Sequence, residues 1–333
     1  MASVLRTPAF LITGLKHFTR SGYERAIASS PEHVNEFMAR RDSLVNQTII
    51  VTGANQGLGL EISLQMAKRQ GTVYMCCRNE QRGKDAVAKV KEASNNKDVH
   101  LVLCDVSSLM DVKRFVDEWE KSKRPLNVLV HNAGVLIHHD VASKGKQKSV
   151  EGNEINFATN TLGVWALTRG MEPVLKRSGT AECKSRVIIV SSGGAYTSGL
   201  EVEDLQGDTL GSDGSAYYAR DKRRQIAMAE YLDEHWKKSG DNVMAMSMHP
   251  GWADTEGVRT SIPGFHKAFK DKLRNVAQGA DTVVYLAVAP QDEVEGGAFY
   301  LDRRVQKKHL TLGFTGYRKQ DVERLVERLD GMV

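Results

Sequence analysis

Six short apolar runs alternate with longer amphipathic stretches, and this alternation leaves few folds open to the chain. The runs are Thr48–Val51, Val73–Cys77, Val99–Cys104, Val128–Val130, Val187–Val190 and Val243–Met248. Stretches with helical periodicity lie between them: Leu58–Arg69, Gln81–Ala93, Leu109–Lys121, Asn153–Lys176 and Tyr217–Lys237. Runs that are apolar throughout are typical of parallel strands buried on both faces. The pattern predicts an α/β fold with one doubly wound parallel sheet, helices on both faces, and ligands at the carboxyl ends of the strands.

Three segments lie outside this repeat. Residues 1–44 precede the first run, residues 193–217 follow the fifth, and residues 303–333 close the chain of 333 residues. No Pro/Ser-rich linker separates them, and α/β folds often use about 250 residues as one unit. We expect an N-terminal helical extension (1–44), one α/β domain (45–302) and a C-terminal tail with a helix (303–333).

Charge and cysteine content exclude several classes of protein. The 46 basic and 41 acidic residues are spread along the chain, without the basic patch of a nucleic-acid binder. No run of about 20 apolar residues occurs, so no transmembrane helix is expected. The four cysteines form no CxxC pair and no metal-ligand spacing. We expect no metal site and a reducing intracellular compartment, either the cytoplasm or an organelle membrane surface.

The first apolar run leads directly into a glycine-rich loop, after which a helix is predicted to open at Leu58. Glycines permit a tight turn and close approach of a pyrophosphate, and a helix N-terminus supplies positive potential. This context predicts a Rossmann-like dinucleotide site. Its expected cofactor-binding residues are Gly53, Asn55, Gln56, Gly57, Leu58 and Gly59.

The end of the second run bears on the choice of cofactor. An acid there would bind the ribose hydroxyls of NAD, but the run ends in Cys77-Arg78-Asn79. Arg78 can pair with a 2′-phosphate, which favours NADP over NAD; the alternative is a solvated surface arginine. Asp105, at the end of the third run, is expected either to accept a hydrogen bond from the adenine amine or to cap the next helix.

Tyr218 and Lys222 are spaced by four residues, which places them on one face of a predicted helix. An ammonium beside a phenol favours phenolate, so Lys222 is expected to lower the pKa of Tyr218 and make it a usable proton donor or acceptor. Polar turns also follow the fourth and fifth runs, as His131-Asn132-Ala133-Gly134 and Ser191-Ser192.

Together these motifs resemble the short-chain dehydrogenase/reductase family in its TGxxxGxG form, over residues 46–300. The resemblance implies that Ser192 hydrogen-bonds the substrate oxygen, that Tyr218 is the acid/base with Lys222 as its partner, and that Asn160 holds a proton-relay water. It also implies that Thr255 of the PGxxxT-like turn meets the nicotinamide carboxamide. Further implied cofactor-binding residues are Asn132, Ala133, Gly134, Tyr218, Lys222, Pro250 and Gly251.

Two positions depart from the family pattern, and one separation is long. His131 replaces the first asparagine of NNAG, and Gln56 stands where NADP-preferring members often carry a basic residue. Tyr218 follows Ser192 by 26 positions, a separation similar to that of retinol-dehydrogenase-like branches with an inserted loop. Residues 14–24, 160–164 and 247–255 are most similar to one branch of the family whose substrate is poorly defined.

The predicted function is hydride transfer between NADP(H) and a carbonyl or secondary alcohol of a lipophilic molecule. The alternative is a dinucleotide-binding scaffold or redox sensor without turnover, and a homo-oligomer stays open. Trp252, Phe265 and Phe269 are expected either to contact an apolar substrate or to anchor a lid on the sheet. His249 is expected to be a packed turn residue. A solvated basic face is expected at Lys267, Lys270, Lys272 and Arg274.

Residues 1–23 carry Arg6, Lys16 and Arg20 and no acid. A helix is predicted with Thr7 as its cap, Pro8 at its first position and Gly22 at its end. Its stripe of Leu11, Leu15 and Phe18 would pack on the domain, lie on a membrane surface, or belong to an organelle-targeting segment.

Overall fold

One eight-stranded sheet runs through the chain, whose computed structural model describes residues 2–311 and 313–333, with side chains from Thr7 onward. The strand order is β3-β2-β1-β4-β5-β6-β7-β8, and every neighbouring pair is parallel except β7 and β8. The strands are β1 Thr48–Thr52, β2 Thr72–Cys77, β3 Val99–Leu103, β4 Val128–His131, β5 Ser185–Val190, β6 Val243–Met248, β7 Phe299–Leu301 and β8 Arg304–Gln306. The predicted doubly wound α/β fold is confirmed.

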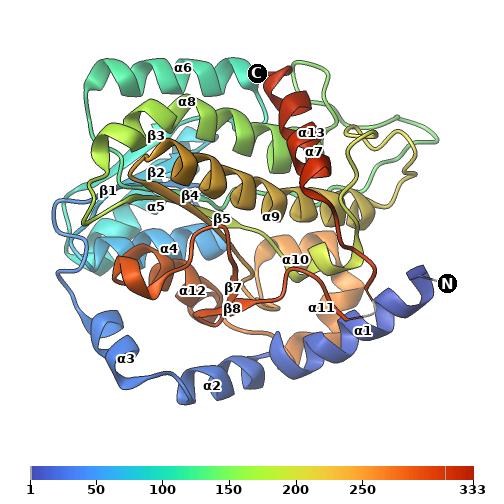
Figure 1. Cartoon of the computed structure of the whole chain (residues 1–333), viewed down its shortest axis with the longest axis horizontal. Helices are drawn as coiled ribbons and strands as arrows, with labels where there is room; N and C mark the ends of the chain where they lie inside the picture. The colour runs from blue at the N-terminus through green and yellow to red at the C-terminus, as the bar shows by residue number, and fades with distance from the viewer. Residues whose placement is uncertain (1, 312) are drawn as a thin grey trace.

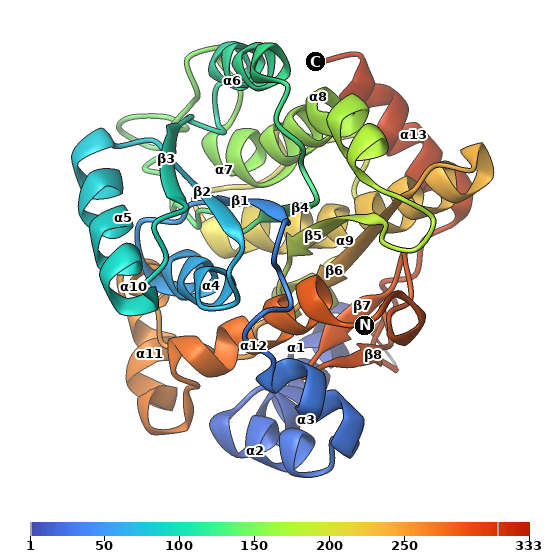
Figure 2. The same ribbon diagram turned by 90° about the vertical axis from the view of Figure 1, so that its left-hand side faces the viewer.

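Helices cover both faces of the sheet, as Figures 1 and 2 show. One face carries α6 (Leu109–Ser122), α8 (Gly163–Ser178), α9 (Gly214–Ser239) and α13 (Lys319–Asp330). The other carries α4 (Gly57–Ala67), α5 (Glu80–Ser94), α12 (Val276–Val288) and, outside them, α3 (Glu32–Ala39). Each face has its own apolar core because the central strands are buried on both sides. Cys76, Cys77 and Cys104 are buried in these cores, as their apolar surroundings predict.

The structure refines two predicted elements. The stretch predicted as one helix over 153–176 is α7 (Ile155–Phe157), a π-helical turn (Ala158–Leu162) and α8. Residues 304–306, which sequence analysis placed in the tail, form β8 after a turn at Asp302 and Arg303, both with positive φ. Such a three-residue edge strand is too short to give an apolar run.

The N-terminal extension forms two helices before α3, and the predicted cap and end were wrong. Helix α1 (Ala2–His17) begins before Thr7 and contains Pro8, and α2 (Arg20–Ala28) includes Gly22. Good helix formers precede Pro8, and Thr19 starts the second helix by accepting a hydrogen bond from Gly22 N (3.3 Å). The side chain of Arg6 lies outside the described residues.

Helix α1 divides its apolar residues between two faces. Phe18 is buried and Phe10 partly buried in an aromatic cluster with Trp252, whose indole would collide with any Cβ on Gly14 (2.2 Å). On the opposite face Leu11, Ile12 and Leu15 are 36%, 69% and 43% exposed. The predicted stripe is thus split: Phe18 packs on the domain, whereas Leu11 and Leu15 face outward. No helix in the described part of the chain is long and apolar enough to cross a membrane.

Candidate active site

The glycine loop and the turn after β4 are held together by hydrogen bonds at the carboxyl ends of β1 and β4. Thr52 Oγ1 accepts from Asn132 N and Ala133 N, both at 3.0 Å. Asn132 Nδ2 donates to the carbonyls of Thr52 (2.9 Å) and Gly53 (3.2 Å). The buried His131 ring lies behind this turn, within hydrogen-bonding distance of Thr168 Oγ1 (2.8 Å). The expected cofactor-binding residues Gly53, Asn132 and Ala133 therefore meet at one edge of the sheet.

The start of α4 fits a pyrophosphate. Its N-cap residue, Gln56, makes no side-chain capping hydrogen bond, so the first N–H groups of the helix have no side-chain partner. Gly57 has φ +56°, and a Cβ there would meet nothing closer than Thr255 at 3.9 Å. Helix N–H groups without a side-chain cap, at a glycine-rich turn, are the arrangement that binds a dinucleotide phosphate. Asn55 precedes this helix start, Leu58 lies within it, and Thr255, after β6, is the side chain nearest to Gly57.

The side chains expected at the adenosine end lie beyond β2 and β3. Arg78 follows β2 directly and is exposed. The Asp105 carboxylate accepts hydrogen bonds from Ser107 N (3.0 Å) and Ser107 Oγ (2.7 Å). Ser108, and not Asp105, is the N-cap of α6, since its hydroxyl accepts from Asp111 N (3.3 Å). Asp105 therefore does not cap the helix, and only its adenine role stays a prediction.

Ser192 and Tyr218 lie together where β5 ends. Ser192 caps the 3₁₀ turn Gly193–Thr197, and its Oγ accepts from Gly194 N (3.1 Å). Burial raises the pKa of Tyr218 to about 12, while the nearby Ser192 hydroxyl opposes this shift. At neutral pH Tyr218 is therefore a protonated phenol that can donate to an oxygen held by Ser192.

Lys222 lies over the face of the Tyr218 ring, and the expectation that it lowers the pKa of Tyr218 is not met, because burial raises that pKa. Its Nζ lies 5.2 Å from the centre of the Tyr218 ring and donates to the carbonyl of Val190 (2.8 Å). Burial lowers the pKa of Lys222 to about 8, opposed by the negative charge of Asp221. Lys222 thus remains mainly an ammonium at neutral pH, in a position fixed by β5.

Asn160 lies in the π-helical turn opposite α9. Its side chain accepts from Val135 N and donates to Val135 O, both at 2.8 Å, and so ties the segment after Gly134 to this turn. Its amide also donates to Asp221 (3.3 Å). Burial raises the pKa of Asp221 to about 6, while Arg224 opposes the shift. The fold brings the four expected catalytic residues, Asn160, Ser192, Tyr218 and Lys222, to one end of the sheet.

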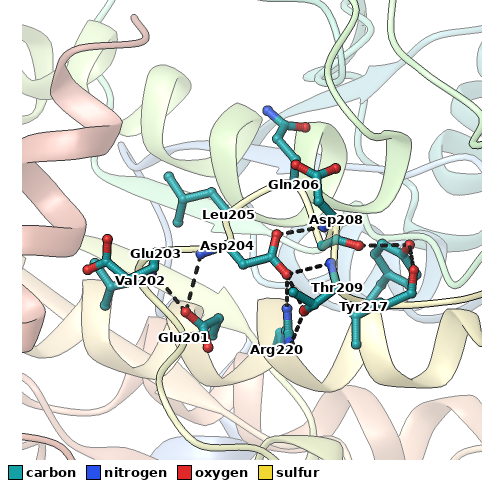
Figure 3. Close-up of polar contacts among 12 residues, drawn as sticks. Glu201, Val202, Glu203, Asp204, Leu205, Gln206, Asp208, Thr209, Tyr217 and Arg220 are labelled. Atoms are coloured by element: carbon teal, nitrogen blue, oxygen red, sulfur yellow. Dashed lines mark hydrogen bonds and ion pairs between the residues drawn. The ribbon is translucent and has the colours of Figure 1, made fainter.

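The segment inserted between Ser192 and Tyr218 is fastened to α9 (Figure 3). Asp204 accepts hydrogen bonds from Asp208 N (2.6 Å), Thr209 N (3.0 Å) and Arg220 Nη1 (2.9 Å). Burial alone would raise the pKa of Asp204, but these hydrogen bonds hold it well below its usual value. Tyr217 adds hydrogen bonds from its hydroxyl to the carbonyls of Gly207 and Leu210 (both 3.1 Å). The loop is thereby fixed to the helix that carries Tyr218.

Two buried arginines that sequence analysis missed follow Lys222 directly. Arg223 donates to the carbonyls of Ala195 (2.6 Å) and Lys308 (2.6 Å), joining the turn after Ser192 to the C-terminal tail. Arg224 donates to the carbonyl of Leu205 (3.1 Å) in the inserted loop. Both lie in a polar stretch of the α9 sequence, where no spacing pattern distinguishes them from surface arginines.

The aromatic residues after β6 pack against one another. The Trp252 ring lies 5.1 Å from Phe265 and 5.0 Å from Phe269, in α11 (Pro263–Phe269), and 6.0 Å from Phe18. The three rings therefore pack as the anchoring alternative predicts, and contact with an apolar substrate stays a prediction. His249 is buried against Phe18, its ring nitrogens have no hydrogen-bond partner in the described structure, and it is the packed turn residue expected.

Arg274 was wrongly assigned to a solvated face. It is 1% exposed and pairs with both carboxylate oxygens of Asp302 (2.5 and 2.9 Å). It also donates to the carbonyls of His17 and Phe18 at the end of α1 (2.7 and 2.9 Å). The reason is long-range: Arg274 follows three exposed lysines in sequence, but its partners come from α1 and from the turn after β7. Pro250 and Gly251 lie in the same packed segment, between β6 and Trp252.

Comparison with known proteins gives the class. The family model described as short chain dehydrogenase matches residues 47–263, and the chain belongs to the short-chain dehydrogenase/reductase family. It is an NAD(P)-dependent oxidoreductase, which sets aside the scaffold alternative.

Individual relatives indicate the branch of the family to which the chain is most similar. Dehydrogenase/reductase SDR family member 12 from Homo sapiens is 37% identical over 98% of each chain, which confirms the branch indicated by residues 14–24, 160–164 and 247–255. Polyprenol dehydrogenase from Danio rerio is 32% identical over 79% of this chain and 80% of the relative. Among solved structures, the Pseudomonas aeruginosa RhlG/NADP active-site complex is similar in fold (TM-score 0.62, 20% identity, 78% of this chain and 95% of the other).

Proposed function

We propose that the chain uses NADP(H) to interconvert a carbonyl and a secondary alcohol of a lipophilic molecule. The placement of the Ser192 hydroxyl and the Tyr218 ring around Gly194, beside the Lys222 ammonium, carries this proposal. Ser192 would hold the substrate oxygen, and Tyr218 would donate its proton to that oxygen in the reductive direction. The bound nicotinamide supplies or accepts the hydride. Lys222 would hold the ribose and stabilise phenolate after the proton has left.

The choice of NADP rests on the end of β2. Arg78 is exposed there, and the residues on either side of it in the sequence, Cys77 and Asn79, are not acids that could bind ribose hydroxyls. A guanidinium is suited to a 2′-phosphate because it offers several donors in one plane. The solved RhlG complex with NADP supports this choice by analogy of fold.

The lipophilic character of the substrate rests on the surroundings of the site. The zebrafish relative is named a polyprenol dehydrogenase, and the outer face of α1 exposes Leu11, Ile12 and Leu15 next to basic side chains. Such a helix fits the headgroup layer of an anionic membrane, where lipophilic substrates reside. We therefore place the protein at a membrane surface through α1.

The experiment is NADPH consumption by the full chain against retinoid, steroid, polyprenal and short water-soluble carbonyls. We expect turnover that increases with the apolar length of the substrate and that disappears in Tyr218→Phe. Turnover confined to short, water-soluble carbonyls would overturn the lipophilic assignment, and preference for NADH would overturn the cofactor.

A further inference from the structure

Gln225 lies one helical turn beyond Lys222 on α9 and is fully buried. Its Oε1 accepts a hydrogen bond from Lys222 Nζ (3.0 Å). Its Nε2 donates to the main-chain carbonyl of Asn160 (2.6 Å). One side-chain amide therefore connects two residues of the candidate catalytic set across the space between α9 and the π-helical turn.

The chemistry of the two partners fixes the orientation of this amide. An ammonium only donates hydrogen bonds and a carbonyl only accepts them, so Oε1 must face Lys222 and Nε2 must face Asn160. A carboxylate could serve the first partner but not the second. An apolar side chain would leave the buried ammonium without one of its two acceptors, the other being the carbonyl of Val190.

The groups around Lys222 make this acceptor important. On α9 its titratable neighbours are Tyr218 and Asp221, and the Asp221 carboxylate is already shared with Arg224 and Thr161. The Lys222 ammonium donates a hydrogen bond to the carbonyl of Val190 in β5. The nearby side chain from the π-helical turn, Asn160, is neutral. Gln225 is therefore the side chain that directly accepts a hydrogen bond from this ammonium.

We propose that Gln225 is a positioning residue that holds the Lys222 ammonium in place and ties it to the Asn160 carbonyl. The proposal rests on the proposed function, because Lys222 acts there on Tyr218 and the ribose. The amide directly connects the Lys222 ammonium with the main-chain carbonyl of Asn160. Loss of the amide should lower the pKa of Lys222, so that less of it is charged, and should thereby destabilise the Tyr218 phenolate.

The test compares Gln225→Met, which keeps the volume and removes both hydrogen bonds, with Gln225→Glu, which keeps an acceptor for Lys222 and adds charge. The first readout is the pH profile of kcat for alcohol oxidation, where the alkaline limb reports loss of the Lys222 proton. We expect Met to move this limb about one to two pH units lower and Glu to leave it or move it higher. Ser185→Ala, which removes a buried hydrogen bond to Leu126 at the far end of β5, should not move it.

The second readout needs no substrate: an NMR titration of the Lys222 side chain, assigned by comparison with Lys222→Met, should show a lower pKa of Lys222 in Gln225→Met. An unchanged limb and an unchanged titration in a folded Met variant would overturn the proposal. If Met does not fold, a limb that moves lower in Gln225→Glu overturns it, and a limb that stays or rises supports it. Lack of turnover in the unmodified chain would contradict the proposed function. The titration would still show whether Gln225 holds the Lys222 ammonium in its charged form.

Discussion

The two halves of the candidate site, from β1 to β4 and from β5 onward, are stabilised by different kinds of contact. From β1 to β4 the contacts are mostly backbone: the glycine loop, the uncapped start of α4, and the hydrogen bonds of Thr52 with the turn after β4. Its charged contributor, Arg78, is exposed. From β5 onward buried charges dominate, on α9 and in the pair Arg274–Asp302. Substitutions in the first half should therefore alter ligand affinity, whereas those in the second should alter chemistry or folding.

Tyr218→Phe should have the largest effect. The phenol is the proton donor in the proposed reaction, so kcat should fall about 100- to 10,000-fold while NADPH affinity stays within about twofold. Steady-state rates and a fluorescence titration of NADPH measure the two quantities. A variant that keeps a tenth of the kcat of the unmodified chain would remove Tyr218 from the acid/base role.

Arg274→Met should show that the buried charges in the half of the site from β5 onward contribute to the free energy of unfolding. It leaves the buried Asp302 carboxylate without its guanidinium, which costs about 3–5 kcal/mol of the free energy of unfolding. Urea titration measures the loss. Lys272→Met, an exposed neighbour, is the control and should change stability by less than about 0.5 kcal/mol. Combining Arg274→Met with Asp302→Leu should recover part of the loss; equal stability of the single variant and the unmodified chain would contradict the assignment.

Arg78→Ala, in the half of the site from β1 to β4, should alter cofactor affinity and leave stability unchanged, in contrast to Arg274→Met. Loss of a charge-assisted phosphate contact should weaken NADPH binding about 10- to 150-fold, with little change in NADH binding or thermal stability. Fluorescence titration with both cofactors measures this. Equal affinity of the unmodified chain for NADPH and NADH would refute the role of Arg78.

Two buried histidines predict a smaller, pH-dependent effect. Burial lowers the pKa of His131 to about 3 and the pKa of His249 well below its usual value of 6.5. Their stabilising contribution is therefore present above about pH 6.5 and is lost as pH falls, by about 1.4 kcal/mol per pH unit for each histidine. Asp221, whose pKa burial raises to about 6, acts in the opposite direction.

A comparison of variants separates these contributions. His249→Leu should flatten the fall in the free energy of unfolding between pH 6.5 and pH 5.5 by about 1 kcal/mol relative to the unmodified chain. Urea titrations at the two pH values give the difference. The same fall in both proteins would mean that His249 is already charged in the folded state.

The two halves also differ in how far sequence predicts them. The glycine loop, the Tyr218/Lys222 spacing and the strand alternation are local patterns, because backbone conformation and helix periodicity act over a few residues. The contacts of Arg274 and Gln225 are not local: Arg274 pairs with Asp302, 28 residues away, and Gln225 with Asn160, 65 residues away. A polar residue in a helix looks the same in sequence whether it meets water or a buried carbonyl. The raised pKa of Tyr218 was missed for the same reason, since the spacing fixes a helix face but not the burial around it.

The exposed face of α1 gives the smallest effect and the last test. Phe18 and Gly14 belong to the core, so removing residues 1–23 would remove packing as well as any membrane contact. The sharper variant is the triple replacement of Leu11, Ile12 and Leu15 by serine, which leaves the packed face intact. The full chain should sediment with vesicles of phosphatidylcholine and phosphatidylglycerol, and the triple variant should not, with an unchanged melting temperature. Replacing Met110 and Val150, which are still more exposed, by serine is the control.

Salt distinguishes this contact from nonspecific adsorption. Lys16 and Arg20 lie near the surface in this geometry, and each contributes about 1 kcal/mol toward an anionic bilayer, so binding should weaken several-fold as ionic strength rises. Apolar contact alone would persist at high salt. If the full chain fails to sediment at any salt concentration, α1 is a packing element whose outer leucines face water. The lipophilic substrate would then have to reach Tyr218 from solution.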